Sequence, residues 1–336
     1  MWTTYAGFHR RYSVRQYCAV WILCCSGLVN AAETISYHGY ANAIELKNDN
    51  IRVVLCPEVG GRILEYSYRG SNVLHLSDAE KQWKPGDKRH SSAGRFDIGP
   101  EFIIPRREVL WSGEWHAEIT GERSARLTSQ QDPATGVQLI RDFNLHRKSS
   151  LLECRQTIVN VSQQPQEWCH WSRTFAVGKG ICVIPLTAPG HPPHSRFPEK
   201  YVMYEESGVI NAKPEDPNIR LKNNSLEIHP TPRKPKLGFD SYAGEIIYLA
   251  PNNLLFLKRF RTYPDRVYNE AAGLTISVWY PDREMVELEP IGPRERLAPG
   301  ESASFTEEWW LAPFSFPVNG SAVDHAQVKQ TTNSFR

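Results

Sequence analysis

The sequence has little net charge, few methionines and no apolar run long enough for a comfortable membrane span. Its 39 Lys and Arg stand against 37 Asp and Glu, a formal charge of +2 over 336 residues. This balance gives no electrostatic reason to expect nucleic acid or an anionic membrane as a partner. The longest apolar run covers residues 17–29, whereas a membrane helix needs about 20 residues. The composition therefore excludes a polytopic membrane protein, and it equally excludes a coiled coil or a collagen-like fibre.

Strong generic motifs are also missing. There is no P-loop, no dinucleotide fingerprint, no His-Glu-x-x-His and no Gly-x-Ser-x-Gly. His191-Pro-Pro-His194 offers two imidazoles in a proline-rich loop, but no third ligand is obvious. We therefore expect neither a cofactor nor a metal.

The first thirty residues have the pattern of a secretory signal. Arg10, Arg11 and Arg15 precede the apolar run without any acid, and the run ends in Val29-Asn-Ala-Ala32. A positive start, a short apolar core and small residues at the end predict a signal peptide over residues 1–32, cleaved after Ala31 or Ala32. The alternative is a retained N-terminal anchor. Cleavage would leave a periplasmic or secreted protein without membrane contact.

Four cysteines remain after the predicted cleavage: Cys56, Cys154, Cys169 and Cys182. An oxidising compartment permits up to two disulfides with three possible connectivities. Four buried free thiols are the alternative, and the sequence does not choose between them.

Short strand-like runs follow one another, with turn signals every 8–15 residues and almost no amphipathic helical period. The 24 prolines and 22 glycines agree with this pattern. We predict an all-β fold in which one sandwich domain spans residues 33–317. Long loops are expected at 77–116 and 187–238, followed by a polar, frayed tail at 318–336.

Two carboxylates on one strand are the most informative candidate chemistry. In Met285-Val-Glu-Leu-Glu289 the alternation of a strand puts Glu287 and Glu289 on one face, about 7 Å apart. Two acids beside apolar neighbours raise the pKa of one of them, which suits a general acid or base near neutral pH. A solvated face of an edge strand is the alternative.

Aromatic segments supply further candidates for a sugar site. Trp168-Cys-His-Trp-Ser172 places His170 on the same strand face as Trp168, where it is either a proton donor beside a sugar or a hydrogen-bonded core histidine. Trp111 and Trp115 are either flat platforms for a sugar ring or caps on the core.

Two basic residues in unusual settings complete the candidates. Arg62 follows a tight Gly-Gly turn and could hydrogen bond hydroxyls or pair with Glu289. Lys258 lies within the apolar run 256–260, either as a ligand group or as an outward-facing strand residue.

Several of these segments together resemble the aldose 1-epimerase (galactose mutarotase)-like superfamily, in a bacterial branch of it. The resemblance runs from about residue 40 to 316. It is carried by Pro57-Glu-Val-Gly-Gly-Arg-Ile-Leu-Glu-Tyr66, by Thr157-Ile-Val-Asn160 with His170-Trp-Ser-Arg-Thr-Phe175, and by Val286-Glu-Leu-Glu-Pro290 with Leu297-Ala-Pro-Gly-Glu301. The family's His-Pro-Tyr/Phe-Phe-Asn and Glu-x-Gln patterns are replaced here by His170-Trp-Ser-Arg and Glu289-Pro-Ile.

The resemblance implies a β-supersandwich whose concave face binds a sugar or an oligosaccharide. By the family's pattern Glu289 would be the base and His170 the acid of an epimerase or mutarotase-type reaction. The same pattern places Arg62, Arg95, Asp97 and Asp240 near the sugar, beside the candidates Trp111, Trp115, Lys258 and Glu287. A non-catalytic carbohydrate-binding module or accessory domain on the same fold is the alternative. The sequence gives no oligomeric state.

Overall fold

The computed structural model describes residues 1–3, 31–84, 86–87, 92–205, 208–281, 284–317 and 321–335. Most of the predicted signal peptide therefore lies outside the described residues. Within the described ranges, no helix is long and apolar enough to cross a membrane. The first strand begins at Glu33, directly after the predicted cleavage positions.

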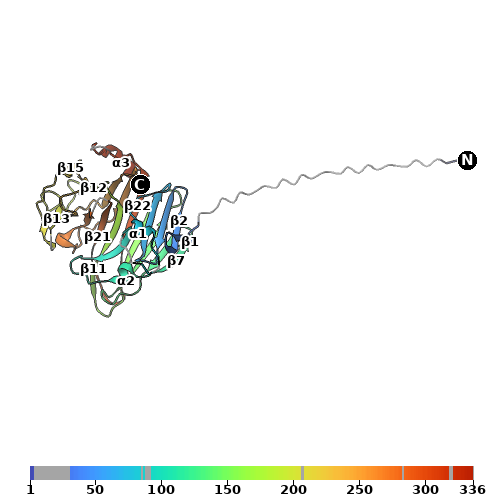
Figure 1. Ribbon diagram of the computed structural model, residues 1–336, viewed down its shortest axis with the longest axis horizontal. Helices are drawn as coiled ribbons and strands as arrows, with labels where there is room; N and C mark the ends of the chain where they lie inside the picture. The colour runs from blue at the N-terminus through green and yellow to red at the C-terminus, as the bar shows by residue number, and fades with distance from the viewer. Residues whose placement is uncertain are drawn as a thin grey trace.

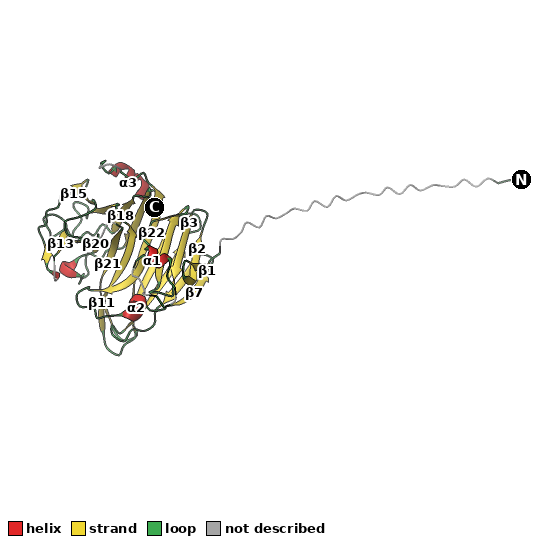
Figure 2. Cartoon of the chain, in the orientation of Figure 1, coloured by secondary structure: helices red, strands yellow, loops and turns green. Residues whose placement is uncertain are grey.

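Two antiparallel sheets form the molecule, and strands dominate it (Figures 1 and 2). The large sheet has twelve strands. Their order across it is β1 (Glu33–Tyr37), β2 (Tyr40–Lys47), β3 (Ile51–Cys56), β4 (Arg62–Tyr68), β6 (Gly94–Gly99), β11 (Gln166–Val177), β21 (Met285–Leu297), β20 (Ile276–Trp279), β17 (Lys236–Phe239), β13 (Val202–Tyr204) and β14 (Ile210–Asn211), while β5 (Ser71–Asn72) pairs with β4.

The small sheet has ten strands and packs against the large one. Its order is β15 (Ile219–Lys222), β16 (Ser225–Ile228), β12 (Ile181–Pro185), β18 (Glu245–Ala250), β19 (Leu254–Phe260), β22 (Ser302–Pro313), β10 (Leu152–Asn160), β9 (Val137–Leu145), β8 (Ser124–Thr128) and β7 (His116–Gly121). The predicted all-β sandwich is confirmed.

The main core lies between the sheets, where alternate residues of facing strands meet. On β11, Trp168 and Ala176 enter this core, while Cys169 and Trp171 belong to a separate cluster on the opposite side of the strand. We call the side of the large sheet that faces the small sheet its inner face and the other side its outer face. This distinction decides which candidate residues can meet.

Both predicted long loops contain regular structure. Residues 77–116 include β6 and the helices α1 (Asp78–Lys81) and α2 (Glu108–Ser112), and residues 187–238 include five short strands, β13 to β17. These strands have two to four residues, too few for the alternation of a strand to stand out from the surrounding prolines.

The predicted frayed tail is also corrected. Helix α3 (His325–Asn333) docks on the far side of the small sheet, where Val328 and Phe335 join a second apolar cluster. Phe335 stacks on Trp310 at 5.0 Å between ring centroids. Val323, Val328 and Phe335, scattered through a polar segment, were too weak a signal to predict this packing. The described residues also include the single helical turn η2 (Ala271–Gly273).

All four cysteines in the described chain are free and buried, which is the second of the two alternatives. Burial raises the pKa of the Cys56 thiol to about 11. It raises the thiol pKa values of Cys154, Cys169 and Cys182 as well.

Candidate functional site

The strongest polar cluster lies on the outer face of the large sheet, where β6, β11 and β21 run side by side. Strand alternation brings its members together. Asp97 lies opposite Trp171, and Arg95 lies opposite Arg173. Across the other edge of β11, Glu287 lies opposite Phe175. We call Arg95, Asp97, Arg107, Trp111, Trp171, Arg173, Glu287 and Glu289 the outer-face cluster.

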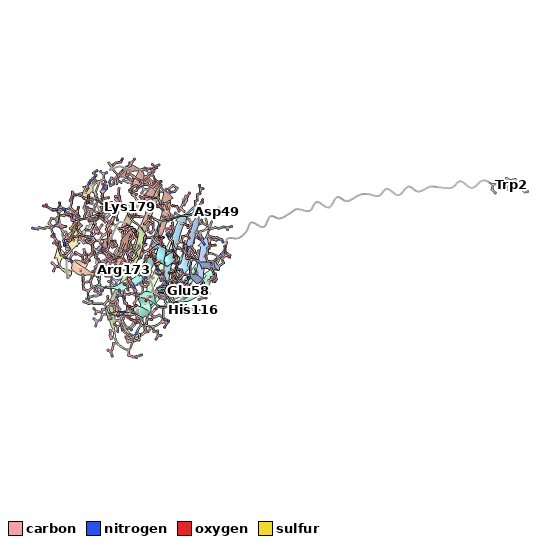
Figure 3. All side chains as sticks on the ribbon, in the orientation of Figure 1. Trp2, Asp49, Glu58, His116, Arg173 and Lys179 are labelled. Carbon is pink, nitrogen blue, oxygen red and sulfur yellow. The ribbon has the colours of Figure 1, made fainter. Side chains whose placement is uncertain are left out.

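Arg173, which is labelled in Figure 3, contacts all three acids of this cluster. Its Nε lies 2.9 Å from Glu287 Oε1 and 3.2 Å from Glu289 Oε1. Its Nη1 lies 3.6 Å from Asp97 Oδ2. Burial alone would lower the pKa of Arg173, but the three carboxylates outweigh it and hold that pKa well above its ordinary value. One guanidinium thus holds three acids on one face of the sheet.

A second arginine closes the cluster from the loop side. Arg107 precedes α2, and its Nε donates to Asp97 Oδ1 at 2.6 Å, while its Nη2 pairs with Asp97 Oδ2. Asp97 is 1% exposed, so both arginines are needed to balance its charge. Arg107 and Arg173 were not among the sequence candidates. The only signal for Arg173 was its position on the same strand face as Trp171, two residues away.

Trp111 covers the guanidinium groups. Its ring centroid lies 4.0 Å from Cζ of Arg95, 5.1 Å from Cζ of Arg173 and 5.5 Å from Cζ of Arg107. Arg95 also donates to the Trp111 carbonyl, and burial lowers the Arg95 pKa well below its ordinary value. Trp111 is half-buried, so part of it remains open to solvent.

Glu289 is the member with unused hydrogen-bonding capacity. Trp171 Nε1 donates to its Oε1 at 3.0 Å. Its Oε2 is buried and has no hydrogen-bond partner among the described residues. A buried carboxylate oxygen without a partner is costly, so its presence calls for an explanation such as a ligand.

Glu287 differs from its neighbour. Burial raises its pKa to about 7, Arg173 partly offsets this, and the nearby Glu289 raises it further. Like charges on one strand face disfavour double ionisation. The alternation argument for Glu287 and Glu289 is therefore confirmed in its geometry, and the pair is buried rather than solvated.

An aromatic and basic rim adjoins the cluster. Lys236 Nζ lies 5.2 Å from the ring centroids of both Trp171 and Tyr204, and it pairs with Glu101. Tyr204 donates to Glu270 Oε1 at 3.4 Å. Sequence reasoning missed this rim because β13 and β17 lie within the predicted loop.

His170 lies on the other face of the same sheet. Its ring is fully buried between Phe96 and Phe305, with centroids 5.8 and 5.7 Å away. Its Nε2 lies 3.1 Å from the carbonyl of Ala303 in the small sheet. Burial lowers its pKa to about 4. Because Trp171 and His170 alternate across β11, an imidazole on the inner face does not meet Glu289, so the expected acid–base pair is not formed.

Lys258 belongs to β19 of the small sheet, and its side chain meets the inner face of the large sheet. Its Nζ lies 3.1 Å from Glu307 Oε2 and donates to Ser172 and Thr174 at 3.0 and 2.8 Å. The bonds to Ser172 and Thr174 join the two sheets, whereas Glu307 belongs to the small sheet, as Lys258 does.

The side chains of Arg62 and Trp115 are buried and make their hydrogen bonds within the protein. Arg62 is fully buried and pairs with Glu80 of α1, not with Glu289, and it donates to the Tyr40 hydroxyl at 2.9 Å. Trp115 packs in the main core, and its Nε1 donates to the Leu110 carbonyl at 3.3 Å. Position 61 of the tight turn requires glycine, because a Cβ there would lie 2.5 Å from the Trp115 ring.

Asp240 lies beyond the end of β17, outside the outer-face cluster. Its Oδ2 accepts a hydrogen bond from the Arg196 backbone N–H at 2.8 Å and pairs with the Arg196 guanidinium, which is not part of the cluster. Of the expected sugar-site residues, the structure thus brings together Arg95, Asp97, Trp111, Glu287 and Glu289.

The described residues hold no group of three or more His, Cys, Asp or Glu arranged to bind a metal. His191 and His194 belong to the loop between β12 and β13.

Comparisons with known proteins place this geometry in a known fold. No protein-family model matches the chain, and no curated protein matches it in sequence. A candidate aldose 1-epimerase from Escherichia coli K12 is 12% identical, with a TM-score of 0.59 over 81% of this chain and 99% of that one. A galactose mutarotase-like protein from Lactobacillus casei is 9% identical, with a TM-score of 0.57 over 81% of this chain and all of that one (100%).

A third solved structure carries the same fold in a different context. A TPR-domain containing protein from Parabacteroides distasonis is 14% identical, with a TM-score of 0.53 over 84% of this chain but 49% of that one. The chain therefore has the galactose mutarotase-like β-sandwich fold. At these identities the likeness is one of fold, and function has to be argued from the site.

Proposed function

We propose that the outer face of the large sheet binds a carbohydrate, with Glu289 as its principal hydrogen-bond acceptor. The partnerless Oε2 of Glu289 carries this proposal. A sugar hydroxyl is a neutral donor, so it can satisfy a carboxylate without adding charge to a cluster that already balances its own.

The surroundings of Glu289 fit a sugar. Trp111, Arg107 and Lys236 are half-buried, so this part of the outer face is open to solvent. An indole offers a flat apolar surface to the C–H side of a pyranose ring, and guanidinium groups donate to its hydroxyls. The likeness to a galactose mutarotase-like protein adds weight to the same ligand class.

Calorimetric titration with a panel of mono- and oligosaccharides tests this proposal, because the panel needs no prior choice of sugar. We expect at least one member to bind the wild type and Glu289→Gln to lose that binding by about tenfold or more. Glu118→Gln is the matched control, since Glu118 is an exposed residue of β7 in the other sheet. Equal affinities in wild type and Glu289→Gln would refute the proposal.

Epimerase chemistry is a second candidate, favoured by the raised pKa of Glu287. A carboxyl that is partly protonated at neutral pH can donate a proton while a neighbouring carboxylate accepts one. Glu289 would take the proton of the anomeric hydroxyl, and Glu287 would protonate the ring oxygen as the C1–O bond breaks. Rotation about C1–C2 and the reverse transfers would then close the ring on its other face.

Exchange spectroscopy by NMR on the two anomers of a bound sugar separates the two candidates. An epimerase accelerates anomer exchange, and both Glu289→Gln and Glu287→Gln abolish the acceleration. A binding module leaves the exchange at its uncatalysed rate while retaining the sugar.

Export is part of the same proposal. The first strand begins at Glu33, so cleavage after Ala31 or Ala32 leaves every strand of the sandwich intact. Intact-mass analysis of protein recovered from the periplasm or medium should show a chain that starts at Ala32 or Glu33. A mass that includes residue 1 would point to the retained anchor.

A further inference from the structure

We propose that the ligand is an oligosaccharide, and that a cavity on the outer face of the large sheet holds a sugar ring beyond the one at Glu289. This inference rests on the proposed carbohydrate function. The cavity has a volume of about 530 Å³ and is lined by, among others, Tyr37, His38, Glu65, His75, Asp78 and Lys81.

The cavity lies in line with the outer-face cluster along β11. Arg173, Phe175 and Val177 share the outer face of that strand, and Val177 lines the cavity. Four residues of strand span about 13 Å from Arg173 to Val177. A single pyranose does not reach from one end to the other, whereas a short oligosaccharide does.

Aromatic side chains occupy the middle of this path. Phe175 lies between the two ends, and the ring of Trp279 meets it edge to face with centroids 6.4 Å apart. Trp279 lies opposite Glu287 in the neighbouring strand and is half-buried. Alternating polar and aromatic contacts along a face are what a chain of sugar rings requires.

The hairpin between β1 and β2 is shaped to hold His38 at the cavity. A Cβ on Gly39 would lie 1.3 Å from the Trp83 carbonyl oxygen, so glycine is required where that loop packs down. Trp83 stacks on Tyr40 with centroids 4.7 Å apart. His38 takes the left-handed conformation of the turn at φ 52°, which costs a non-glycine residue about 1 kcal/mol or more. Backbone strain of this kind gathers at functional positions.

The acids Glu65 and Asp78 of the cavity wall are each paired with a cation, which favours a neutral ligand. Glu65 accepts from Arg52 at 2.8 Å and from Ser67 at 2.5 Å, and Lys81 pairs with Asp78 at 2.9 Å. Burial, assisted by Lys81, lowers the pKa of His38 and keeps its imidazole neutral. An anionic sugar would find no unpaired cation in this part of the described chain.

Two imidazole rings remain to bind hydroxyl groups. No side-chain hydrogen bond is made by His38 or His75 within the described residues, although the ring of His38 contacts Tyr37 edge to face at 4.3 Å. A neutral imidazole has one donor and one acceptor nitrogen, and a sugar hydroxyl complements either. The pair therefore supplies the polar contacts of a second sugar-binding position.

Titration with saccharides of increasing length tests this inference. We use glucose, cellobiose and cellotetraose, together with galactose, galactobiose and galactotetraose. The wild type should bind one tetrasaccharide about tenfold more tightly than its monosaccharide. His75→Ala should remove that gain and leave monosaccharide affinity unchanged. His116→Ala, at an exposed histidine of β7, should do neither.

An NMR titration of the wild-type protein provides a second test that does not depend on the variants. The ring signals of His38 and His75 should shift in NMR spectra on adding the tetrasaccharide but not the monosaccharide, while those of His116 stay in place. Affinity that is independent of length, or imidazole signals that do not respond, would overturn this inference and leave a single sugar position at Glu289. Absence of binding at every length would instead refute the proposed function.

Discussion

Buried charged groups lie at both faces of the large sheet, but their hydrogen bonding differs. On the inner face the Nζ of Lys258 is surrounded by Ser172, Thr174, Leu288 and Glu307, so its donors are used within the fold. On the outer face Glu289 keeps one carboxylate oxygen without a partner in the described chain.

This difference underlies our proposal that the outer-face charges bind a ligand, whereas the charges between the sheets stabilise the fold. Inner-face groups bind residues of both sheets, and replacing one of them weakens the sandwich. Outer-face groups are held by arginines of one sheet and a loop, so they can exchange partners without opening the core. Burial alone therefore does not identify a site, since Lys258 and Glu289 are equally buried. An unused hydrogen-bonding atom also occurs on the inner face, at Nδ1 of His170, so the case for Glu289 rests on its unused oxygen together with the half-buried Trp111, Arg107 and Lys236 near it.

The largest effect should come from breaking the inner-face ion pair. Lys258→Met leaves Glu307 buried without its cation, which should lower the free energy of unfolding by about 3–5 kcal/mol. Urea denaturation measures this loss. The double variant Lys258→Met/Glu307→Gln should recover much of it, and a single variant within 1 kcal/mol of wild type would contradict this account of the inner face.

His170 should make stability fall in acid. Its pKa is lowered to about 4 in the folded chain, so between about pH 6.5 and 4 the unfolded chain binds a proton that the folded chain does not. The stability present above pH 6.5 is therefore lost as pH falls, by about 3 kcal/mol in total. His170→Phe should flatten this part of the pH profile of urea denaturation. An unchanged slope would show that His170 is not buried as a neutral group.

Glu287 should act in the opposite direction and somewhat less. Its pKa is raised to about 7, so the folded chain binds the extra proton and the contribution is full below about pH 4.5. It is then lost as pH rises towards 7, by about 1–3 kcal/mol. Because this pH range overlaps that of His170, the two contributions partly cancel in the wild type, and Glu287→Gln should make the loss of stability towards acid steeper. Parallel profiles for Glu287→Gln and wild type would contradict the assignment.

Much of the fold was predictable, because turn signals and short apolar runs mark most strands of the two sheets. The alternation on β21 correctly grouped Glu287 with Glu289, and the alternation on β11 correctly grouped His170 with Trp168. What alternation does not reveal is which of two faces meets the other sheet. Here both faces of β11 are buried, so the polar pattern that usually marks the outside is missing.

The rest of the site depends on contacts between segments far apart in the chain. Arg107 reaches Asp97 from the loop before α2, and Lys236 reaches Trp171 from a four-residue strand. Neither segment has a periodic pattern that would point to the cluster. The family resemblance assigned an acid–base role to His170 from its position in the sequence. That role requires the side chains of His170 and Glu289 to point to the same face of the large sheet.

A single set of calorimetric titrations most directly tests the claim that sugar binds on the outer face. Wild type, Glu289→Gln and His170→Phe are titrated with the same saccharide, after each is shown to be folded. The account predicts that Glu289→Gln loses binding by about tenfold or more while His170→Phe keeps wild-type affinity. Full binding by Glu289→Gln together with loss of binding by His170→Phe would contradict it.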